Sequence, residues 1–347
     1  MRVLVTGHLG YVGPIVLRQL KEAGHWVAGL DCGYFRDCTD AHAALTRPDR
    51  EWIADIRDMG AEVVRGMDAV IHLAGLSNDP MGQLDPGLTA AINHRATIRL
   101  ARMAQDEGVG RFIFASSCSL YGASGDAARP LDEDAPLAPV SAYARSKADC
   151  ETDLAALATG GFAPFSLRFA TAYGLSPRMR LDLVLNNLTS WARATGVVRV
   201  MSDGTPWRPL VHIEDMAQAM LCALTAPVGE RRAFNVGRDD DNLRVAEIAD
   251  IVSRQIPGSR VEITGDAGGD PRSYRVDFSR VSQGLPGFAP RWSVTAGCEQ
   301  IDRWLCDRKL STAHIQSRHF VRLGQLQHLR KGGVIDDGLR LMDVLAC

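Results

Sequence analysis

Short, continuous apolar runs alternate with longer amphipathic segments along the first half of this chain. The runs lie at residues 2–6, 26–31, 69–73, 111–116 and 164–169, with a shorter one at 52–54. Helical periodicity fills residues 12–23, 87–107 and 141–158 between them. A strand that is apolar at every position is buried on both faces, which is typical of a parallel sheet with helices on each side. The alternation therefore predicts an α/β fold built on a doubly wound parallel sheet.

After residue 174 the alternation becomes less regular. Helical patterns at 183–194 and 214–224 flank a Gly/Pro turn at 203–209, and shorter α/β pieces continue to about residue 308. We therefore expect one domain at residues 1–174 and a smaller C-terminal α/β lobe at 175–308, interleaved with the end of the first. Residues 309–347 carry several basic side chains, and we expect them to form a docking tail or an oligomer contact whose charges lie in solvent.

Composition narrows the class of protein. The chain has 347 residues, 46% of them apolar and 23% charged, which describes a globular chain with ample material for a core. With 39 basic and 41 acidic side chains, no general attraction to nucleic acid or to an anionic membrane is expected. No apolar run approaches the ~18 residues of a membrane span. The eight cysteines form no Cys-x-x-Cys pair, so we expect reduced thiols, no bound metal and a cytoplasmic location.

A glycine-rich segment stands between the first predicted strand and the first predicted helix. Gly7, Gly10 and Gly13 follow one another at intervals of three. Glycine permits a tight turn and a close approach of the backbone to a ligand. The N–H groups at a helix start, together with the positive end of its dipole, bind phosphate. The spacing alone is a weak signal, but its place between strand and helix predicts a dinucleotide pyrophosphate site that includes Tyr11 and Val12.

The second predicted strand ends in an acidic residue. Asp31 follows Gly13 by 18 residues, close to the ~20 expected for a carboxylate that binds the adenosine ribose hydroxyls. Such a carboxylate would repel a 2′-phosphate, which favours NAD over NADP. Arg36 lies five residues further on and could in principle accept that phosphate. Asp31 could also cap a turn at the strand end.

A tyrosine and a lysine are spaced for one face of a helix. Tyr143 and Lys147 lie four residues apart within a predicted helix, so their side chains project from the same face. A nearby ammonium stabilises phenolate, so we expect Lys147 to lower the pKa of Tyr143 from ~10 toward working pH, as a general base requires. The strand before this helix ends in hydroxyl residues that include Ser117, and ligands of a doubly wound sheet bind at such strand ends.

Together these residues resemble the extended short-chain dehydrogenase/reductase family, in its NAD-dependent nucleotide-sugar epimerase/dehydratase branch. The resemblance covers about residues 1–308. It rests on the glycine-rich turn, Asp31, the Ser-rich strand end and the Tyr/Lys pair, and further on Asp55-Ile56, His72-Leu73-Ala74-Gly75, Asn93 and the segment Arg208-Pro209-Leu210-Val211-His212-Ile213-Glu214-Asp215. It implies a Rossmann fold with NAD as cofactor. The cofactor-binding residues implied are Gly7, Gly10, Tyr11, Val12, Gly13, Asp31, Asp55, Ile56, Leu73, Ala74, Gly75, Asn93, Tyr143 and Lys147.

The resemblance also implies a role for each catalytic residue. Tyr143 would be the base, Lys147 would bind the nicotinamide ribose and tune Tyr143, and Ser117 would bond the reacting hydroxyl. The substrate, a nucleotide-diphosphate sugar, would contact Ser77, Asn78, Ser117, Ser119, Tyr143, Thr171, Asn187, Arg208 and Arg272. Arginine suits a diphosphate because its fork is bidentate and permanently charged. Relatives of this kind commonly form homodimers through the helices that would contain residues 87–107 and 141–158.

The residues beside the predicted base bear on the reaction. A 4,6-dehydratase of this branch usually carries an Asp-Glu pair where this chain has Cys118-Ser119, and a decarboxylase usually carries Glu at the second position. Epimerisation, most simply at C4, and reduction by a 4-ketoreductase remain, and Asp31 disfavours the NADPH that a reductase usually takes. Cys118 could act as an acid or base in a C3/C5 epimerase or could pack in the core. A non-catalytic dinucleotide sensor is the alternative from another class, although such proteins typically lose the Tyr or the Lys.

Overall fold

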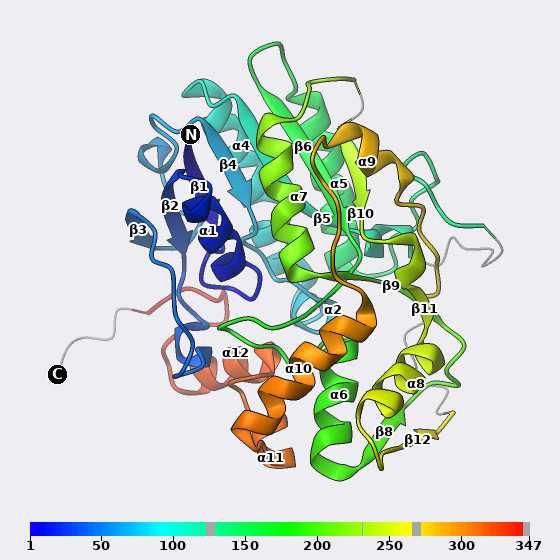
Figure 1. The fold of residues 1–347 in the computed structure, drawn as a ribbon. Coiled ribbons are helices and arrows are strands. Elements are labelled where there is room, and N and C mark those ends of the chain that lie inside the picture. Colours follow the sequence, from blue (N-terminus) through cyan, green and yellow to red (C-terminus); the bar gives the residue numbers. More distant parts are fainter. Residues whose placement is uncertain (123–128, 231, 266–271, 343–347) are drawn as a thin grey trace.

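The computed structural model describes all residues except 123–128, 231, 266–271 and 343–347 (Figure 1). Its centre is a seven-stranded sheet in the order β10-β6-β5-β4-β1-β2-β3, in which every neighbouring pair is parallel. The doubly wound parallel sheet predicted from the sequence is therefore confirmed. The strands are β1 (Arg2–Thr6), β2 (Trp26–Asp31), β3 (Arg50–Ile53), β4 (Ala69–His72), β5 (Arg111–Ser117), β6 (Ala163–Phe169) and β10 (Ala233–Val236).

Helices cover both faces of this sheet, as the continuous apolar runs require. On β1, Val3 and Val5 belong to the apolar cluster that contains α1 (Gly13–Glu22) and α7 (Ile213–Thr225). Leu4, between them, belongs to the cluster with α4 (Ala96–Asp106) and α5 (Ala142–Ala156). Figure 1 shows these two helix pairs on opposite faces of the sheet. Successive side chains of a strand point to opposite faces, so a strand between two helix layers is apolar at every position.

The second half of the chain builds two smaller sheets and also returns to the first. One sheet has the order β11-β9-β7 and the other pairs β12 with β8, while β10 joins β6 in the central sheet. Trp207–His212 forms a strand through Pro209, so the predicted turn at 203–209 ends earlier than expected. The elements are β7 (Thr171–Tyr173), β8 (Val197–Val200), β9 (Trp207–His212), β11 (Asn242–Arg244), β12 (Arg260–Ile263), α6 (Val184–Thr195), α8 (Val245–Gln255), α9 (Ser279–Gly284) and α10 (Val294–Arg308).

The predicted helix at 87–107 is divided into three pieces. Asp85 caps α3 (Pro86–Thr89) by accepting bonds from Gly87 N and Leu88 N, and Ala90–Arg95 then forms a π-helical stretch before α4. Stretches of π-helix often accompany functional sites. Other short pieces are α2 (Asp79–Gly82), η1 (Arg36–Cys38), η2 (Ala61–Val63), η4 (Cys118–Tyr121) and η5 (Asp239–Asp241).

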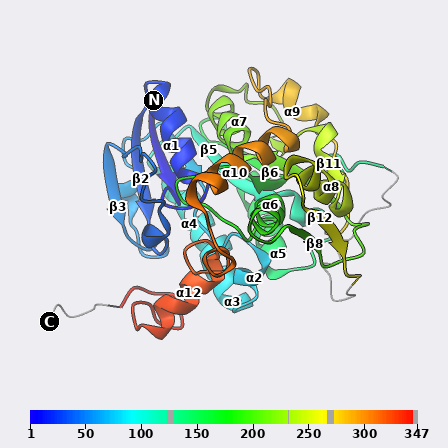
Figure 2. The same cartoon turned by 60° about the horizontal axis from the view of Figure 1, so that its bottom comes forward.

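The described part of residues 309–347 folds back on the protein. It contains α11 (Thr312–Ile315) and α12 (Arg322–Lys331), and α12 lies against α2 (Figure 2). The expectation that its charges lie in solvent is wrong for Arg322, whose side chain is only 2% exposed. Helical periodicity could not reveal this burial because α12 is polar on most of its surface, and its partners are distant in sequence.

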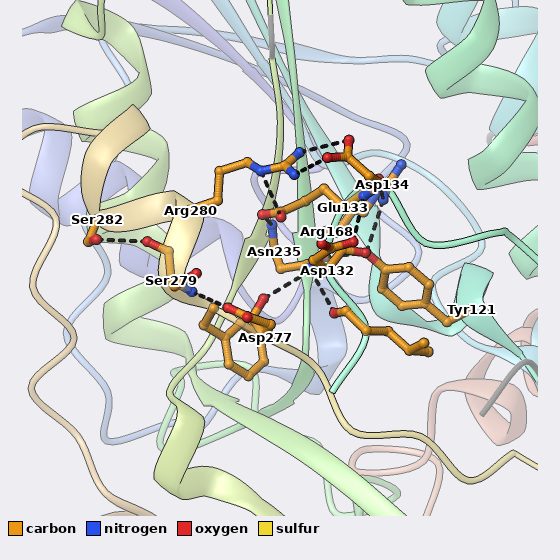
Figure 3. Close-up of polar contacts among 12 residues, drawn as sticks. Tyr121, Asp132, Glu133, Asp134, Arg168, Asn235, Asp277, Ser279, Arg280 and Ser282 are labelled. Carbon is orange, nitrogen blue, oxygen red and sulfur yellow. Dashed lines mark hydrogen bonds and ion pairs between the residues drawn. The ribbon is translucent and has the colours of Figure 1, made fainter. Parts of the chain in front are cut away.

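A network of buried polar side chains ties β6 to β10 and to α5 behind the crevice, and Figure 3 shows part of it. Arg168 on β6 donates to Oε1 of Glu151 on α5 at 3.1 Å and to its Oε2 at 2.7 Å, and also to the hydroxyl of Tyr121 at 3.0 Å. Tyr121 donates in turn to Asn235 on β10 at 2.7 Å. Glu133 accepts from the backbone N–H of Asn235 at 2.8 Å. The network therefore pairs its buried charges within the protein.

Candidate active site

A cavity of about 740 Å³ lies at the carboxyl ends of the central strands. The strand order reverses between β1 and β4, and this switch point is where open α/β sheets bind their ligands. The site residues predicted from the sequence that line the cavity are Gly7, Gly10, Tyr11, Val12, Gly13, Asp31, Asp55, Ile56, Leu73, Ala74, Gly75, Ser77, Asn78, Ser117, Ser119, Tyr143, Lys147, Thr171, Asn187, Arg208 and Arg272. Asn93 alone among the predicted residues is not part of this wall within the described chain.

The glycine-rich turn has the geometry of a phosphate cradle. Gly7 has a φ of +74°, and a Cβ there would lie 2.7 Å from the backbone nitrogen of Ala74. A Cβ on Gly13 would lie 2.4 Å from the carbonyl oxygen of His8. α1 begins at Gly13 without a side-chain cap, so its first N–H groups remain available to an anion. These residues fit the diphosphate of a dinucleotide.

Asp31 lies beside this turn. Its carboxylate accepts from Leu9 N at 3.0 Å and from Gly33 N at 2.7 Å, which holds it at the cavity wall. Each carboxylate oxygen can accept a further bond, as ribose hydroxyls would require. Arg36 lies 3.7 Å from Glu51, an ion pair that directs its guanidinium to that carboxylate. The arrangement around Asp31 suits a ribose without a 2′-phosphate.

Asn93 lies behind the cavity wall and supports a loop of it. Its amide oxygen accepts from Leu76 N at 2.7 Å, and its amide nitrogen donates to Leu76 O at 3.0 Å. The same oxygen would be 2.9 Å from a Cβ on Gly75, which explains why this loop carries glycine there. Asn93 therefore acts on the wall through the loop at Gly75 and Leu76.

Ser117, Tyr143 and Lys147 meet at the cavity. Ser117 lies close enough to the Tyr143 phenol to influence its pKa, and the Lys147 ammonium lies 5.7 Å from the Tyr143 ring while donating to Ala115 O at 2.7 Å. The expected direction of the Tyr143 pKa is wrong for this structure: burial raises it to about 12, against a lowering by the Ser117 side chain. Burial also lowers the pKa of Lys147 to about 8. Desolvation outweighs charge stabilisation here because both groups are buried.

The three residues around Ser117 face different environments. Ser116 donates to Glu151 at 2.5 Å. Cys118 donates to Arg168 O at 3.1 Å, and burial raises its pKa, so it packs in the core rather than at the cavity. Ser119 lines the cavity, and its buried hydroxyl oxygen has no hydrogen-bond partner. A buried hydroxyl without a partner is costly. It is therefore a position where a ligand can supply the missing bond.

The other predicted substrate residues line the opposite part of the wall. Asn187 on α6 donates to Leu181 O at 2.8 Å. Arg208 on β9 donates to Trp207 O at 2.8 Å and also to Arg272 O. Two guanidinium groups from distant parts of the sequence are thus brought to one end of the cavity.

The structure adds wall residues that sequence reasoning missed. Arg180 pairs with Asp182 at 2.9 Å and reaches Ser77 Oγ at 3.3 Å. Asp79 pairs with Arg272 at 2.5 Å. Arg322 of α12 also lines the cavity. Arg180 and Asp182 follow β7 in a stretch without helical or strand periodicity, so no local pattern indicated them.

The cradle, the acid beside it and the Ser/Tyr/Lys group define a dinucleotide-dependent enzyme with a doubly wound sheet. A model of the NAD dependent epimerase/dehydratase family matches residues 3–237. The chain belongs to this family, and its cofactor is NAD. Among the described residues, no group of three or more His, Cys, Asp or Glu could hold a metal ion. No helix in the described part of the chain is long and apolar enough to cross a membrane.

Several known proteins are similar over most of their length. The UDP-glucose 4-epimerase of Corynebacterium glutamicum is 29% identical across 84% of this chain and 91% of its own. The dTDP-glucose 4,6-dehydratase of an Actinoplanes species is 28% identical across 88% and 97%. The structure of MoeE5 in complex with UDP-glucose and NAD superposes with a TM-score of 0.74 and 26% identity, covering 89% of this chain and all of that one.

Proposed function

We propose that this enzyme is an NAD-dependent nucleotide-sugar epimerase that inverts one sugar carbon, most simply C4. The observation that carries the proposal is the meeting of Ser117, Tyr143 and Lys147 at the cavity beside an unpartnered Ser119 hydroxyl. Similarity to a UDP-glucose 4-epimerase and to MoeE5 bound to UDP-glucose supports the class of substrate.

The proposed chemistry divides between cofactor and protein. When bound, NAD supplies reversible acceptance of a hydride from carbon. Tyr143 takes the proton of the sugar hydroxyl, and Ser117, which lies beside the phenol, holds that hydroxyl in line. The positive charge of Lys147 would favour the phenolate and so act against the burial that raises the Tyr143 pKa. After the keto-sugar has presented its other face, the hydride would return to that face of the carbonyl carbon while Tyr143 returns the proton to the oxygen, which completes the inversion without net use of cofactor.

The state of the cavity carboxylates favours epimerisation over dehydration. Elimination of water needs an acid and a base besides Tyr143. Asp55 is held by Arg57 at 2.5 Å, Asp79 by Arg272, and Asp182 by Arg180. The position beside Ser117 carries Cys118, which faces the core. We infer that these carboxylates orient arginines rather than transfer protons.

The proposed binding of the substrate uses the other end of the cavity. Arg208 and Arg272 would bind the diphosphate, and Asn187 and Thr171 would contact it from α6 and β7. The Ser119 hydroxyl would bond the sugar. Homodimer formation through α4 and α5 remains a prediction.

The test is product identification. Purified enzyme is incubated with UDP-, GDP-, CDP- and dTDP-sugars without added NAD(P)H, and products are assigned by proton NMR. We expect an epimer of one sugar at equilibrium and no net change in cofactor. A 4-keto-6-deoxy product, or turnover only with added NADPH, would contradict the proposal. Ser119→Ala should raise KM for the active sugar, whereas Ser282→Ala, whose hydroxyl bonds Ser279 O at the surface, should not.

A further inference from the structure

The C-terminal segment, residues 309–342, spans the mouth of the cofactor crevice. Three of its apolar side chains join a buried cluster with residues from both sides of that crevice. Tyr34 follows β2 on the adenosine side, whereas Leu76, Met81 and Ile92 lie beyond β4. The cluster contains Tyr34, Leu76, Met81, Ile92, Leu326, Ile335 and Leu339. A segment that packs on both sides of an opening closes part of it.

Polar bonds attach the same segment to the adenosine side. Gln325 donates to Tyr34 O at 2.9 Å. Arg57, which pairs with Asp55, donates to Gly338 O at 2.8 Å and Leu339 O at 2.9 Å. The Tyr34 hydroxyl also donates to Leu339 O. These bonds hold the segment in one position relative to the residues predicted to contact adenosine.

Arg322, the first residue of α12, brings a buried positive charge to the cavity. It lines the cavity, although it is only 2% exposed. Its guanidinium donates to Arg178 O at 2.7 Å and to His319 O at 3.4 Å, and it lies 4.7 Å from the centre of the Phe35 ring. In the described chain, no carboxylate lies within 4.0 Å of the Arg322 guanidinium. Carbonyl oxygens orient this charge but do not neutralise it.

Arg178 adds a second buried charge of the same kind. It is 5% exposed, its Nε has no hydrogen-bond partner, and it too forms no ion pair with any described residue. Burial lowers the pKa of Arg322 to about 10; Arg180 and Arg178 act in the same direction, and Cys38 and Asp182 only partly offset the effect. Buried charges without partners are strongly unfavourable, so the two guanidinium groups of Arg322 and Arg178 lack a counter-charge until an anion binds beside them.

The position of Arg322 and Arg178 favours the cofactor as the source of that anion. Ser176 donates to Tyr11 O at 2.6 Å, so the stretch that accepts the Arg322 bond also contacts the glycine-rich turn. Arg322 lies close enough to affect the Tyr11 phenol electrostatically. The ten-residue helix α12 begins without a side-chain cap, which adds the positive end of its dipole at Arg322. Arg208 and Arg272, by contrast, stand at the substrate end.

We propose that the C-terminal segment completes the NAD site and that Arg322 binds the diphosphate of the bound dinucleotide. The glycine-rich turn then contacts that diphosphate through backbone N–H groups, and Arg322 contacts it through a side chain supplied by the other end of the chain. This inference rests on NAD as the cofactor and is independent of which sugar the enzyme converts.

The test compares Arg322→Gln with Arg330→Gln, a control on the same helix whose exposed guanidinium pairs with Asp337. Affinities for NAD, ADP-ribose, adenosine and UDP are measured by calorimetry or ligand-observed NMR. We expect Arg322→Gln to weaken NAD and ADP-ribose binding by about 10- to 100-fold, as loss of a charged hydrogen bond does. Adenosine and UDP binding should be unchanged, and Arg330→Gln should behave as wild type.

Three outcomes would overturn the proposal. Unchanged NAD affinity would show that Arg322 does not contact the cofactor. An equal loss for adenosine, which has no diphosphate, would show that Arg322 only maintains the shape of the site. A loss for UDP alone would assign the charge to the substrate. If Arg322→Gln does not fold, Arg322→Lys retains the charge without the fork and should weaken NAD several-fold; wild-type affinity in that variant would equally contradict the proposal.

Discussion

Two buried arginines of this enzyme have opposite surroundings. Arg168, in the network behind the crevice, donates to Glu151. It also donates to Tyr121 and to the backbone carbonyl of Glu133, as Figure 3 shows. Burial opposes its charge, but the Glu151 bonds raise its pKa above the ordinary value. Within the part of the chain that the structure describes, Arg322 at the cavity wall donates hydrogen bonds only to carbonyl oxygens, and burial lowers its pKa. The charge of Arg168 is paired within the protein, whereas we propose that the charge of Arg322 is paired by a ligand.

The different surroundings of Arg168 and Arg322 distinguish polar groups that stabilise the fold from polar groups that bind a ligand. A buried pair that is satisfied internally resists removal of either partner, because the other is left charged and alone. A wall of incompletely satisfied polar groups, such as Arg322 and the Ser119 hydroxyl, gains bonds only when a ligand arrives. Substitutions in the two regions should therefore have separable effects on unfolding and on activity.

Of the substitutions considered, Tyr143→Phe should have the largest effect on activity and little effect on the stability of the fold. Loss of the proton-transferring hydroxyl should reduce kcat by roughly 10²- to 10⁴-fold, the range for general acid–base catalysis. Bound NAD and thermal unfolding should change little, since the variant removes only the phenol oxygen and keeps the buried ring. Turnover of the active nucleotide sugar and NAD content after gel filtration are the measurements. Retained activity would refute the role of Tyr143 and would remove the contrast between the two regions.

Arg168→Met should give the opposite result in the buried network. Leaving Glu151 charged and alone should lower the free energy of unfolding by about 3–5 kcal/mol. Arg65→Met is the control, because its pair with Glu107 is exposed at 3.3 Å and should contribute ~0–1 kcal/mol. Urea unfolding followed by circular dichroism measures both. Equal losses in the two variants would show that the buried network is not more important for stability than a surface pair.

Asp31→Asn should weaken NAD much more than NADP. Loss of a charged bond to ribose hydroxyls should reduce NAD affinity by roughly 10- to 100-fold, while removing the charge that repels a 2′-phosphate. Asp37→Asn, at an exposed position near the same end, is the control. Titration of both cofactors measures the ratio. An equal loss for NAD and NADP would count against Asp31 as the ribose ligand.

His72 allows a smaller test, because it is buried in the core yet neutral. It bonds Thr6 at 2.6 Å and Thr97 at 2.7 Å, and burial lowers its pKa to about 3 from an ordinary 6.5. Below pH 6.5 the unfolded chain binds a proton at His72 that the folded protein excludes, so acid destabilises the fold through this group. The contribution reaches about 1.4 kcal/mol per pH unit between 6.5 and 3.

The variant His72→Asn should therefore show a shallower decline of the unfolding free energy in this pH range than wild type. The exposed His42 serves as control, since His42→Asn should leave the slope unchanged. Denaturant unfolding at several pH values measures the slope. Parallel declines in wild type and His72→Asn would show that His72 does not contribute to acid sensitivity.

Regular elements of the fold were predictable because their signals are local. The strands Arg2–Thr6 and Trp26–Asp31 agree residue by residue with the apolar runs. The π-helical stretch at Ala90–Arg95 was not predictable, because its sequence is compatible with an ordinary helix and its Asn93 bonds a loop 17 residues away. The sequence predicts a turn through Pro209, whereas the structure places it within β9. The strands that pair with β9, β11 and β7, lie more than 30 residues away in the sequence, so no local signal reveals the pairing.

The cavity wall shows the same division. Gly7, Asp31 and Tyr143 occupy positions that follow from strand ends and helix faces, so the order of elements was enough to bring them together. The direction of the Tyr143 pKa was not predictable, because charge proximity can be read from spacing but desolvation depends on the whole surroundings.

The amino-acid sequence by itself determined the strands β1, β2, β4, β5 and β6, the glycine-rich turn, the acid at the end of β2 and the Tyr/Lys spacing, because each depends on residues within a few positions of one another. The tertiary structure alone decided that Arg322 reaches the cavity, that Cys118 turns into the core and that Ser119 is left without a partner. Those outcomes depend on how distant segments pack, and burial and pairing of a charge exist only once the packing is complete.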